Sequence, residues 1–244
     1  MRKSSLFILA LLASAILFAQ SETRDLDSFT KVAVGESIDV ILKKGNKESA
    51  KVVVDDIDLE EVMTEVVGDK LKIYLEGNSY RNVDVQVTVT YVSLDGLKSS
   101  SSSSIEGTEL IVASGAFDIA CSSSGNIEAA IKAESIDIDV SSSGDVDLEV
   151  EADEIEIEVS SSGDIDISGK TNTIEVSASS SGSVDGYGLK CGDADLRASS
   201  SGSIRLTVDG ELEARASSGG SIRYEGSPTR TDADTSSGGS VRKS

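Results

Sequence analysis

A serine-rich cluster recurs through the second half of this 244-residue chain at an almost constant interval. Self-similarity at a fixed, short period is typical of solenoids, in which each repeat forms one coil that contacts only its neighbours. The repeat therefore constrains the fold more than any other feature of the sequence. The clusters begin at Ser122, Ser141, Ser160, Ser179, Ser199, Ser217 and Ser236, with spacings of 19, 19, 19, 20, 18 and 19 residues.

Each repeat contains two stretches in which aliphatic and polar residues alternate. Val146, Leu148 and Val150 follow one cluster in this way, and Ile155 and Ile157 precede the next. A period of two predicts β-strands with one apolar face. Two short strands cannot bury their apolar faces alone, but coils stacked about 4.8 Å apart can. We predict an all-β fold, a single right-handed parallel β-helix with coils of about 19 residues.

The motif Ser-Ser-Ser-Gly is predicted to form the corner between the two strands of a coil. Glycine turns a chain at low steric cost, and we expect stacked serine hydroxyls to hydrogen-bond along the axis. The residue before the corner becomes smaller towards the C-terminus, so the last coils should be the least stable. These residues are Cys121, Val140, Val159, Ala178, Ala198, Ala216 and Thr235.

Residues 1–19 have the layout of a secretory signal peptide, because Arg2 and Lys3 precede an apolar run that ends at Phe18. Cleavage after Ala19 fits best. No cysteine stands near this position and no later stretch is apolar enough to span a bilayer. We therefore predict an exported protein without a lipid anchor or an integral membrane segment, located in the periplasm, at the outer-membrane surface or outside the cell.

Residues 20–98 lack the 19-residue period but still alternate in the manner of β-strands. We interpret them as an N-terminal cap with irregular first coils, continuous in one domain with the regular coils of residues 99–244. The stretch that begins at Ile57 has an amphipathic pattern, and we expect a turn or one short helix there.

The chain is strongly acidic, and this excludes some partners. Loss of residues 1–19 removes two basic and no acidic residues, so the net charge falls from −21 to −23. Such a surface repels nucleic acid and anionic lipid. Disorder is a competing explanation for acidity, but disordered chains are poor in β-branched residues and lack periodicity, whereas this chain has Val and Ile at regular spacing.

Catalysis is a weak candidate. The pairs Asp145 with Asp147 and Asp164 with Asp166 have the residue types of a glycosidase acid and base. Those roles require two carboxyl groups in unlike environments, and here both pairs belong to a regular acidic outer face. The chain has no histidine to activate its many serines. We therefore predict no enzymatic activity.

A cation site is a second candidate. The central outward position of the strand before each corner is always acidic, and carboxylates about 4.8 Å apart repel one another. Calcium would relieve that repulsion because it binds several oxygen ligands, although a charged face that keeps the sheet soluble explains the same pattern. No other cofactor is predicted. The predicted ladder is Asp118, Asp137, Glu156, Glu175, Asp195, Glu213 and Asp232.

The strand after the corner carries a second ladder, which changes sign along the chain. Together with Arg197, Arg215, Arg230 and Lys243, its arginines give the acidic rod a basic end. This end could dock an acidic glycan or another copy of the chain head to tail, and compensation of nearby carboxylates is the alternative explanation. The oligomeric state stays open. The residues are Glu128, Asp147, Asp166, Asp185, Arg205, Arg223 and Arg242.

Two cysteines in an exported protein suggest a disulfide, but the repeat argues against one. Cys121 holds an inward position and Cys191 lies 70 residues further on, more than three coils away. The axial gap is of order 15 Å, whereas a bridge needs Cα atoms within about 7 Å. We predict two free thiols.

Three segments carry a family resemblance: RDLDSFTKVAVGESIDVILKKG from Arg24, GDKLKIYLEG from Gly68, and VDVQVTVTYVSLDGL before the serine-rich coils. Together they resemble the head GIN domain family, exported proteins of Bacteroidetes that carry the label autotransporter adhesin. The resemblance covers nearly all of the mature chain and implies a right-handed β-helical domain. It transfers no catalytic residues, because none is agreed for the family.

We therefore expect an exported, non-enzymatic binding or adhesin-like module of the cell envelope that recognises a glycan or a protein through its solenoid surface. The adhesin assignment rests on family analogy. Two other classes remain open. A polysaccharide-active β-helix enzyme would release reducing ends from acidic glycans, and a purely structural envelope protein would bind no ligand.

Overall fold

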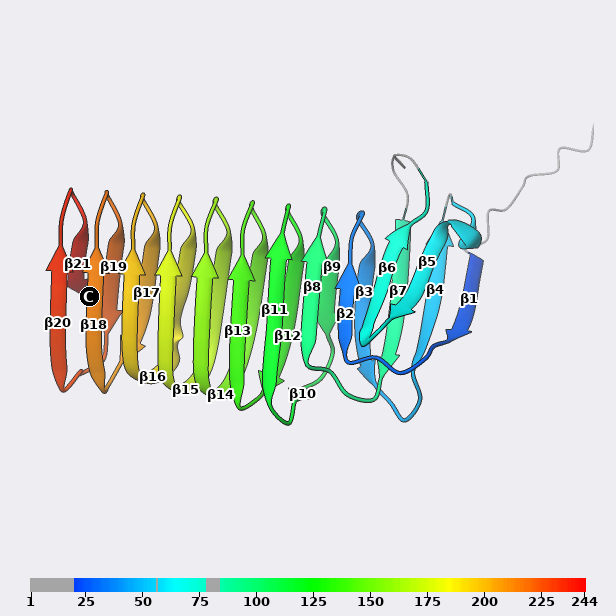
Figure 1. Ribbon diagram of the computed structural model, residues 1–244, viewed down its shortest axis with the longest axis horizontal. Coiled ribbons are helices and arrows are strands. Elements are labelled where there is room, and N and C mark those ends of the chain that lie inside the picture. The colour runs from blue at the N-terminus through cyan, green and yellow to red at the C-terminus, as the bar shows by residue number, and fades with distance from the viewer. Residues whose placement is uncertain (1–19, 56, 78–83) are drawn as a thin grey trace, which may run out of the picture.

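The structure is a computed structural model that describes residues 20–55, 57–77 and 84–244. The predicted signal peptide lies outside the described residues. The strands stack along one axis into a rod in which two sheets face each other (Figure 1). Each coil runs up one strand, turns at a serine-rich corner and returns along a second strand, which confirms the predicted parallel β-helix with its 19-residue coils.

We call the two sheets pre-corner and post-corner, after the position of their strands relative to the corner. Several long strands contribute their second half to the pre-corner sheet and their first half to the post-corner sheet. The pre-corner sheet runs in the order β5 (Val62–Val67), β6 (Lys70–Leu75), β2 (Lys31–Val34), β8 (Gly96–Ser100), β11 (Ala116–Ser122), β13 (Ser135–Val140), β14 (Asp145–Val159), β15 (Asp164–Ala178), β16 (Ser183–Ala198), β18 (Glu211–Ala216) and β20 (Arg230–Thr235).

The post-corner sheet follows the same axis. A short strand, β10 (Ile111–Val112), extends its pairing at the edge opposite the corners, where it lies beside the end of β12. The order is β1 (Gln20–Asp25), β4 (Ser49–Asp55), β7 (Asp84–Tyr91), β3 (Asp39–Lys44), β9 (Ser104–Gly107), β12 (Asn126–Lys132), β14, β15, β16, β17 (Ser203–Val208), β19 (Ser221–Glu225) and β21 (Ser240–Lys243).

The core lies between the two sheets and is built from the apolar half of each alternation. In β13, Ile136, Ile138 and Val140 are buried while Asp137 and Asp139 face solvent. The register pairs each inward residue with its equivalent one coil away, so aliphatic side chains stack in continuous columns along the axis. Because strands of the regular coils are flanked by strands of the same alternation, both outer faces carry mainly charged and polar columns at fixed spacing.

The corner differs from the sequence prediction in one respect. Ser142 and Ser143 have φ angles of 53° and 60°, and the Gly144 amide donates to the Ser141 carbonyl at 3.0 Å. Two left-handed central residues closed by that hydrogen bond make a type I′ turn. The serines therefore turn the chain. A Cβ on Gly144 would lie 2.8 Å from the backbone of Cys121, so the glycine is required because two coils approach closely there.

The predicted hydrogen bonds from corner serine hydroxyls along the axis occur near the N-terminal end, where the Ser103 hydroxyl donates to the Val34 carbonyl of the neighbouring coil at 3.1 Å, but the later corners lack them. Within the stretch from residue 122 to residue 239, the corner hydroxyls make no side-chain hydrogen bond to one another. Backbone groups connect the corners instead, because the Ser143 amide donates to the Ser161 carbonyl of the next coil at 3.1 Å. The hydroxyls of Ser142 and Ser143 are left exposed to solvent.

Two coils precede those that the repeat revealed. The first consists of β2 and β3 and turns at Glu36 and Ser37, and the second consists of β8 and β9 and turns at Ser101 and Ser102. All four of these residues have positive φ angles, like their equivalents further on. A long insertion separates the two coils in the sequence and hides their period.

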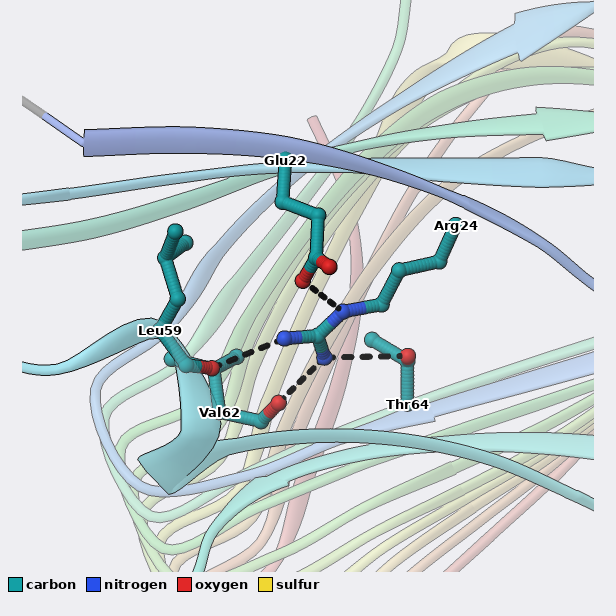
Figure 2. Close-up of polar contacts among 5 residues, drawn as sticks. All are labelled: Glu22, Arg24, Leu59, Val62 and Thr64. Atoms are coloured by element: carbon teal, nitrogen blue, oxygen red, sulfur yellow. Dashed lines mark hydrogen bonds and ion pairs between the residues drawn. The ribbon is translucent and has the colours of Figure 1, made fainter.

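The inserted strands close the N-terminal end of the rod. β6 and β7 continue the two sheets beyond the first coil, and antiparallel β5, β4 and β1 finish them. The stretch from Ile57 forms one 3₁₀ turn, η1 (Leu59–Glu61), and then enters β5, in agreement with the expected short helix. Figure 2 shows how Arg24 of β1 connects the edges of the two sheets.

Arg24 makes three hydrogen bonds across this end. Its guanidinium donates to the Leu59 carbonyl at 2.8 Å, to the Val62 carbonyl, and to the Thr64 hydroxyl at 3.3 Å. It also pairs with Glu22 at 2.8 Å. We call this group the Arg24 clamp. Because Leu59, Val62 and Thr64 belong to η1 and the pre-corner edge strand, the clamp holds them against the post-corner edge strand.

The two cysteines are free and buried. Cys121 pairs in register with Val140, as the repeat predicted, and Cys191 lies beside Thr171 and Val208. Burial raises the pKa of the Cys121 thiol to about 11 and that of the Cys191 thiol to about 12. Both thiols are therefore protonated at neutral pH and act as small apolar core groups.

Candidate functional site

The predicted carboxylate ladder is present as one row on the pre-corner sheet. Consecutive members are register partners in adjacent strands, and all except the last, Asp232, are flanked by buried residues on their own strand. The row therefore has one carboxylate per coil at a spacing of about 4.8 Å. We call it the acidic column: Asp118, Asp137, Glu156, Glu175, Asp195, Glu213 and Asp232.

A lysine of the first coil neutralises one end of the acidic column. Lys31 Nζ lies 2.6 Å from Asp118 Oδ2, although Gly96 stands between them in the register. A Cβ on Gly96 would lie 3.2 Å from Lys31 Cγ, so the absence of a side chain gives the lysine room to cross. The hydrogen bond to Asp118 raises the pKa of Lys31. The residues are 87 positions apart, and sequence reasoning missed this contact.

Arginines neutralise the column towards its other end. Arg197 contacts Glu175 and lies 2.6 Å from Asp195 Oδ2, and Arg215 contacts Glu213. Both arginines occupy outward positions two residues nearer the corner than the carboxylates. On this sheet, compensation of nearby carboxylates explains the basic residues.

The middle of the acidic column is left without a basic partner. Asp137 and Glu156 form no ion pair with any residue that the structure describes. Burial, with Asp139 and Asp118 nearby, raises the pKa of Asp137, and the charge of Asp137 raises the pKa of Glu156. The two carboxylates therefore repel each other, and a cationic group that bound between them would relieve the repulsion.

The column presents its carboxylates singly. In the described part of the chain, no group of three or more His, Cys, Asp or Glu side chains converges on one point in the manner of a metal centre. Calcium prefers six to eight oxygen ligands, so a cation on this face would take further ligands from water or from a bound molecule. Calcium binding by the column stays a prediction.

The carboxylate pairs considered for catalysis lie on the other sheet. Asp145, Asp147, Asp164 and Asp166 are all exposed on the outer face of β14 and β15. Partial burial and its acidic neighbours raise the pKa of Asp166. The two members of each pair thus share one open, solvated surface, which does not provide the unlike environments that an acid and a base require.

The sign-changing ladder is also one row, on the post-corner sheet. Arg205 lies 3.0 Å from Asp185 Oδ2 at the point where acidic residues give way to basic ones. We call this row the mixed column. Its members, each paired in register with the next, are Glu128, Asp147, Asp166, Asp185, Arg205, Arg223 and Arg242.

Comparison with known proteins agrees with this architecture. A family model described as "Putative auto-transporter adhesin, head GIN domain" matches residues 28–228. No curated protein matches the chain. Among the residues that the structure describes, no helix has the length and apolar character needed to cross a membrane.

Three solved structures of similar fold come from species of Parabacteroides. A putative adhesin from Parabacteroides merdae has a TM-score of 0.85 at 17% identity, over 93% of this chain and 96% of that one. A putative adhesin from Parabacteroides distasonis has a TM-score of 0.85 at 20% identity, over 93% and 97%. A protein from the same species, described as a putative lipid binding protein, has a TM-score of 0.81 at 20% identity, over 93% and 96%.

Proposed function

Because the chain belongs to the head GIN domain family, we propose that it is an exported, non-enzymatic, adhesin-like module of the cell envelope. It recognises a glycan or a protein through the outer surface of its solenoid. The observation that supports this role is the acidic column. Its carboxylates project from paired strands at a constant spacing, and the central ones have no cation of their own.

A surface of this kind suits a long ligand. Strands fix the backbone position of each acidic residue, so little backbone conformational entropy is lost when a partner binds. A hollow beside the column is lined by Glu175, Asp195, Glu213 and Arg230, so donors and acceptors both face a ligand there. The ligand is either a protein segment with basic side chains or a glycan whose oxygen atoms share calcium ions with the carboxylates.

Surface location is the first condition for adhesion. Intact cells are treated with protease, and the mature protein is followed with an antibody beside a known periplasmic protein. We expect the protein to be digested while the periplasmic protein survives. Survival of both until the outer membrane is opened would exclude direct adhesion under those conditions.

Binding is then tested with glycan and host-protein arrays, each in calcium and in chelator. The double variant Asp137→Asn, Glu156→Gln removes the two uncompensated carboxylates in the middle of the column, and we expect it to lose most of the binding. The control Asp145→Asn, Asp164→Asn removes the same charge from the opposite sheet of the same coils and should bind like the wild type. Equal binding by both variants would contradict a role of the column. Release of reducing ends from any acidic glycan would contradict the non-enzymatic assignment.

A further inference from the structure

The mixed column separates its charges completely along one straight line. Four carboxylates are followed by three arginines, and each residue is the register partner of the next. Arg205 pairs with Asp185, but Arg223 and Arg242 make no ion pair with any described residue. In a chain with about twice as many acidic as basic residues, two uncompensated arginines in register require an explanation.

The outward column next to the mixed column lies two residues nearer the corner on each strand. It changes from acidic residues to serines at nearly the same coil. Asn126, Asp145 and Asp164 are followed by Ser183, whose register partners further on are Ser203, Ser221 and Ser240. Two columns together therefore carry two negative charges per coil at β14 and β15, and one positive charge per coil at β17, β19 and β21. On the pre-corner sheet, by contrast, Arg197 and Arg215 are already paired.

We propose that two copies of this chain associate face to face through their post-corner sheets, antiparallel to each other, about a two-fold axis between Asp185 and Arg205. This operation places Arg223 opposite Asp166 of the second copy and Arg242 opposite Asp147. Every contact occurs twice, as in any isologous interface. The two rows have the same spacing, because they are the same column in two copies of one chain.

A second copy fits this face better than an unrelated polyanion does. A linear acidic polymer would complement only the arginine half and would meet the four carboxylates of the other half. A second copy complements both halves.

Tyr187 supports the same axis. It lies in the bulge of β16 next to the change of sign, and its hydroxyl is 2.7 Å from Ser244 Oγ. The hydrogen bond holds the half-buried side chain along the face, and the two-fold axis brings the two copies of this aromatic residue near the centre of the interface. Aromatic residues at an interface centre commonly carry much of the binding energy.

Ionic strength should affect this association in both directions. Near physiological salt the Debye length is about 8 Å, so opposed pairs attract while the remaining charges of two chains at −23 are screened. At very low salt the net charges repel, and at about 1 M the pairs are themselves screened. We expect the association to be strongest at intermediate salt. It leaves the acidic column exposed on both copies, so it is independent of the proposed function.

Sedimentation velocity of residues 20–244 tests the proposal through a charge exchange. One variant carries Arg223→Asp and Arg242→Asp, and the other carries Asp147→Arg and Asp166→Arg. We expect each alone to weaken association roughly tenfold or more, because like charges then face each other. An equal mixture should restore it, because every reversed residue then meets its complement.

A matched control carries Asp139→Arg and Glu158→Arg, the same change of charge on the pre-corner sheet of the same region, and should associate like the wild type. Thermal melts confirm that all variants fold. Three results would overturn the proposal. The wild-type chain could stay monomeric at all salt concentrations, the charge-reversal variants could associate as tightly as the wild type, or their equal mixture could fail to restore association.

Discussion

The two ends of the solenoid are built in opposite ways. At the N-terminal end, antiparallel strands continue both sheets beyond the first coil, and the Arg24 clamp connects their edges. At the C-terminal end, β20 and β21 form the last coil, and no residue from 226 to 244 is buried. Because each coil contacts mainly its neighbours, stability is a sum of local terms. We therefore expect the rod to unfold from its C-terminal end.

Core truncations should show the largest contrast. Ile138 of β13 is fully buried, and Ile138→Ala is expected to lower the free energy of unfolding by about 3 kcal/mol through lost burial and a residual cavity. Val241→Ala in the last coil should cost less than about 1 kcal/mol, since that side chain is only half-buried. Urea unfolding followed by circular dichroism measures both. Equal losses would mean that the last coil is as well packed as the middle.

Corner glycines test the same contrast through steric overlap. Gly144→Ala pushes a methyl group into the Cys121 backbone of the preceding coil and should cost about 2 kcal/mol. A Cβ on Gly239 would lie even closer to its neighbour, the Ala216 carbonyl oxygen, but nothing described lies beyond its coil, which can move outward. Gly239→Ala should therefore cost clearly less in the same unfolding experiment. A larger loss at Gly239 would show that the last corner is held rigidly.

Arginines at the two ends offer a matched pair. Arg24→Ala removes charged hydrogen bonds to two backbone carbonyls and should cost about 2 kcal/mol. Arg230→Ala breaks only a 3.6 Å surface pair with Glu211 and should change stability by less than about 0.5 kcal/mol. Hydrogen exchange should locate the Arg24 effect in β1 and β5. Similar values for both variants would argue that the clamp does not stabilise its end.

Charge substitutions in the acidic middle of the rod should have the smallest effect on stability. They involve neither end and therefore serve as a reference for both. Asp137, Glu156 and Asp166 have raised pKa values, so the folded chain binds protons more tightly than the unfolded chain there. Their contribution to stability grows as the pH falls from neutral through the raised pKa values towards the ordinary values near 4.

Asp137→Asn should therefore raise the melting temperature slightly at pH 7 and reduce its pH dependence. Glu151 should contribute to stability with the opposite pH dependence. Hydrogen bonds from Lys132 and Lys170 lower its pKa, so its contribution is present at neutral pH and is lost on acidification through the lowered value. Glu151→Gln should lower the melting temperature at pH 7. If both variants shifted the melting temperature at pH 7 in the same direction, this assignment of the electrostatic interactions would be contradicted.

The repeat alone predicted the rows of the outer faces, and the reason is geometric. A corner of constant length fixes the phase of every strand, so Asp137 and Glu156 must be register partners. Even the spacings of 20 and 18 residues do not disturb this phase. Register shifts between Asp166 and Ser168 in β15 and between Gly186 and Lys190 in β16 absorb the difference, and the corners stay aligned.

Features that depend on distant contacts were not predictable in this way. The first coil has Gly-Glu-Ser at its corner and is separated from the second by the inserted strands, so no period reveals it. Lys31 reaches Asp118 only because Gly96 leaves space between them. The role of the corner glycine was misjudged because steric contact with the neighbouring coil is invisible in a single repeat. The carboxylates of the site were therefore predictable, but their cationic partners were not.

The coil stack also determines how this molecule would respond to mechanical force. A pull on the C-terminus, against a fixed N-terminal end, loads the hydrogen bonds of β21 and β20 first, while the Arg24 clamp is the last to be stressed. Coils would detach one after another, and each 19-residue coil releases roughly 60 Å of extended chain. The rod would then lengthen in equal steps under load and lose its outer faces gradually, from one end.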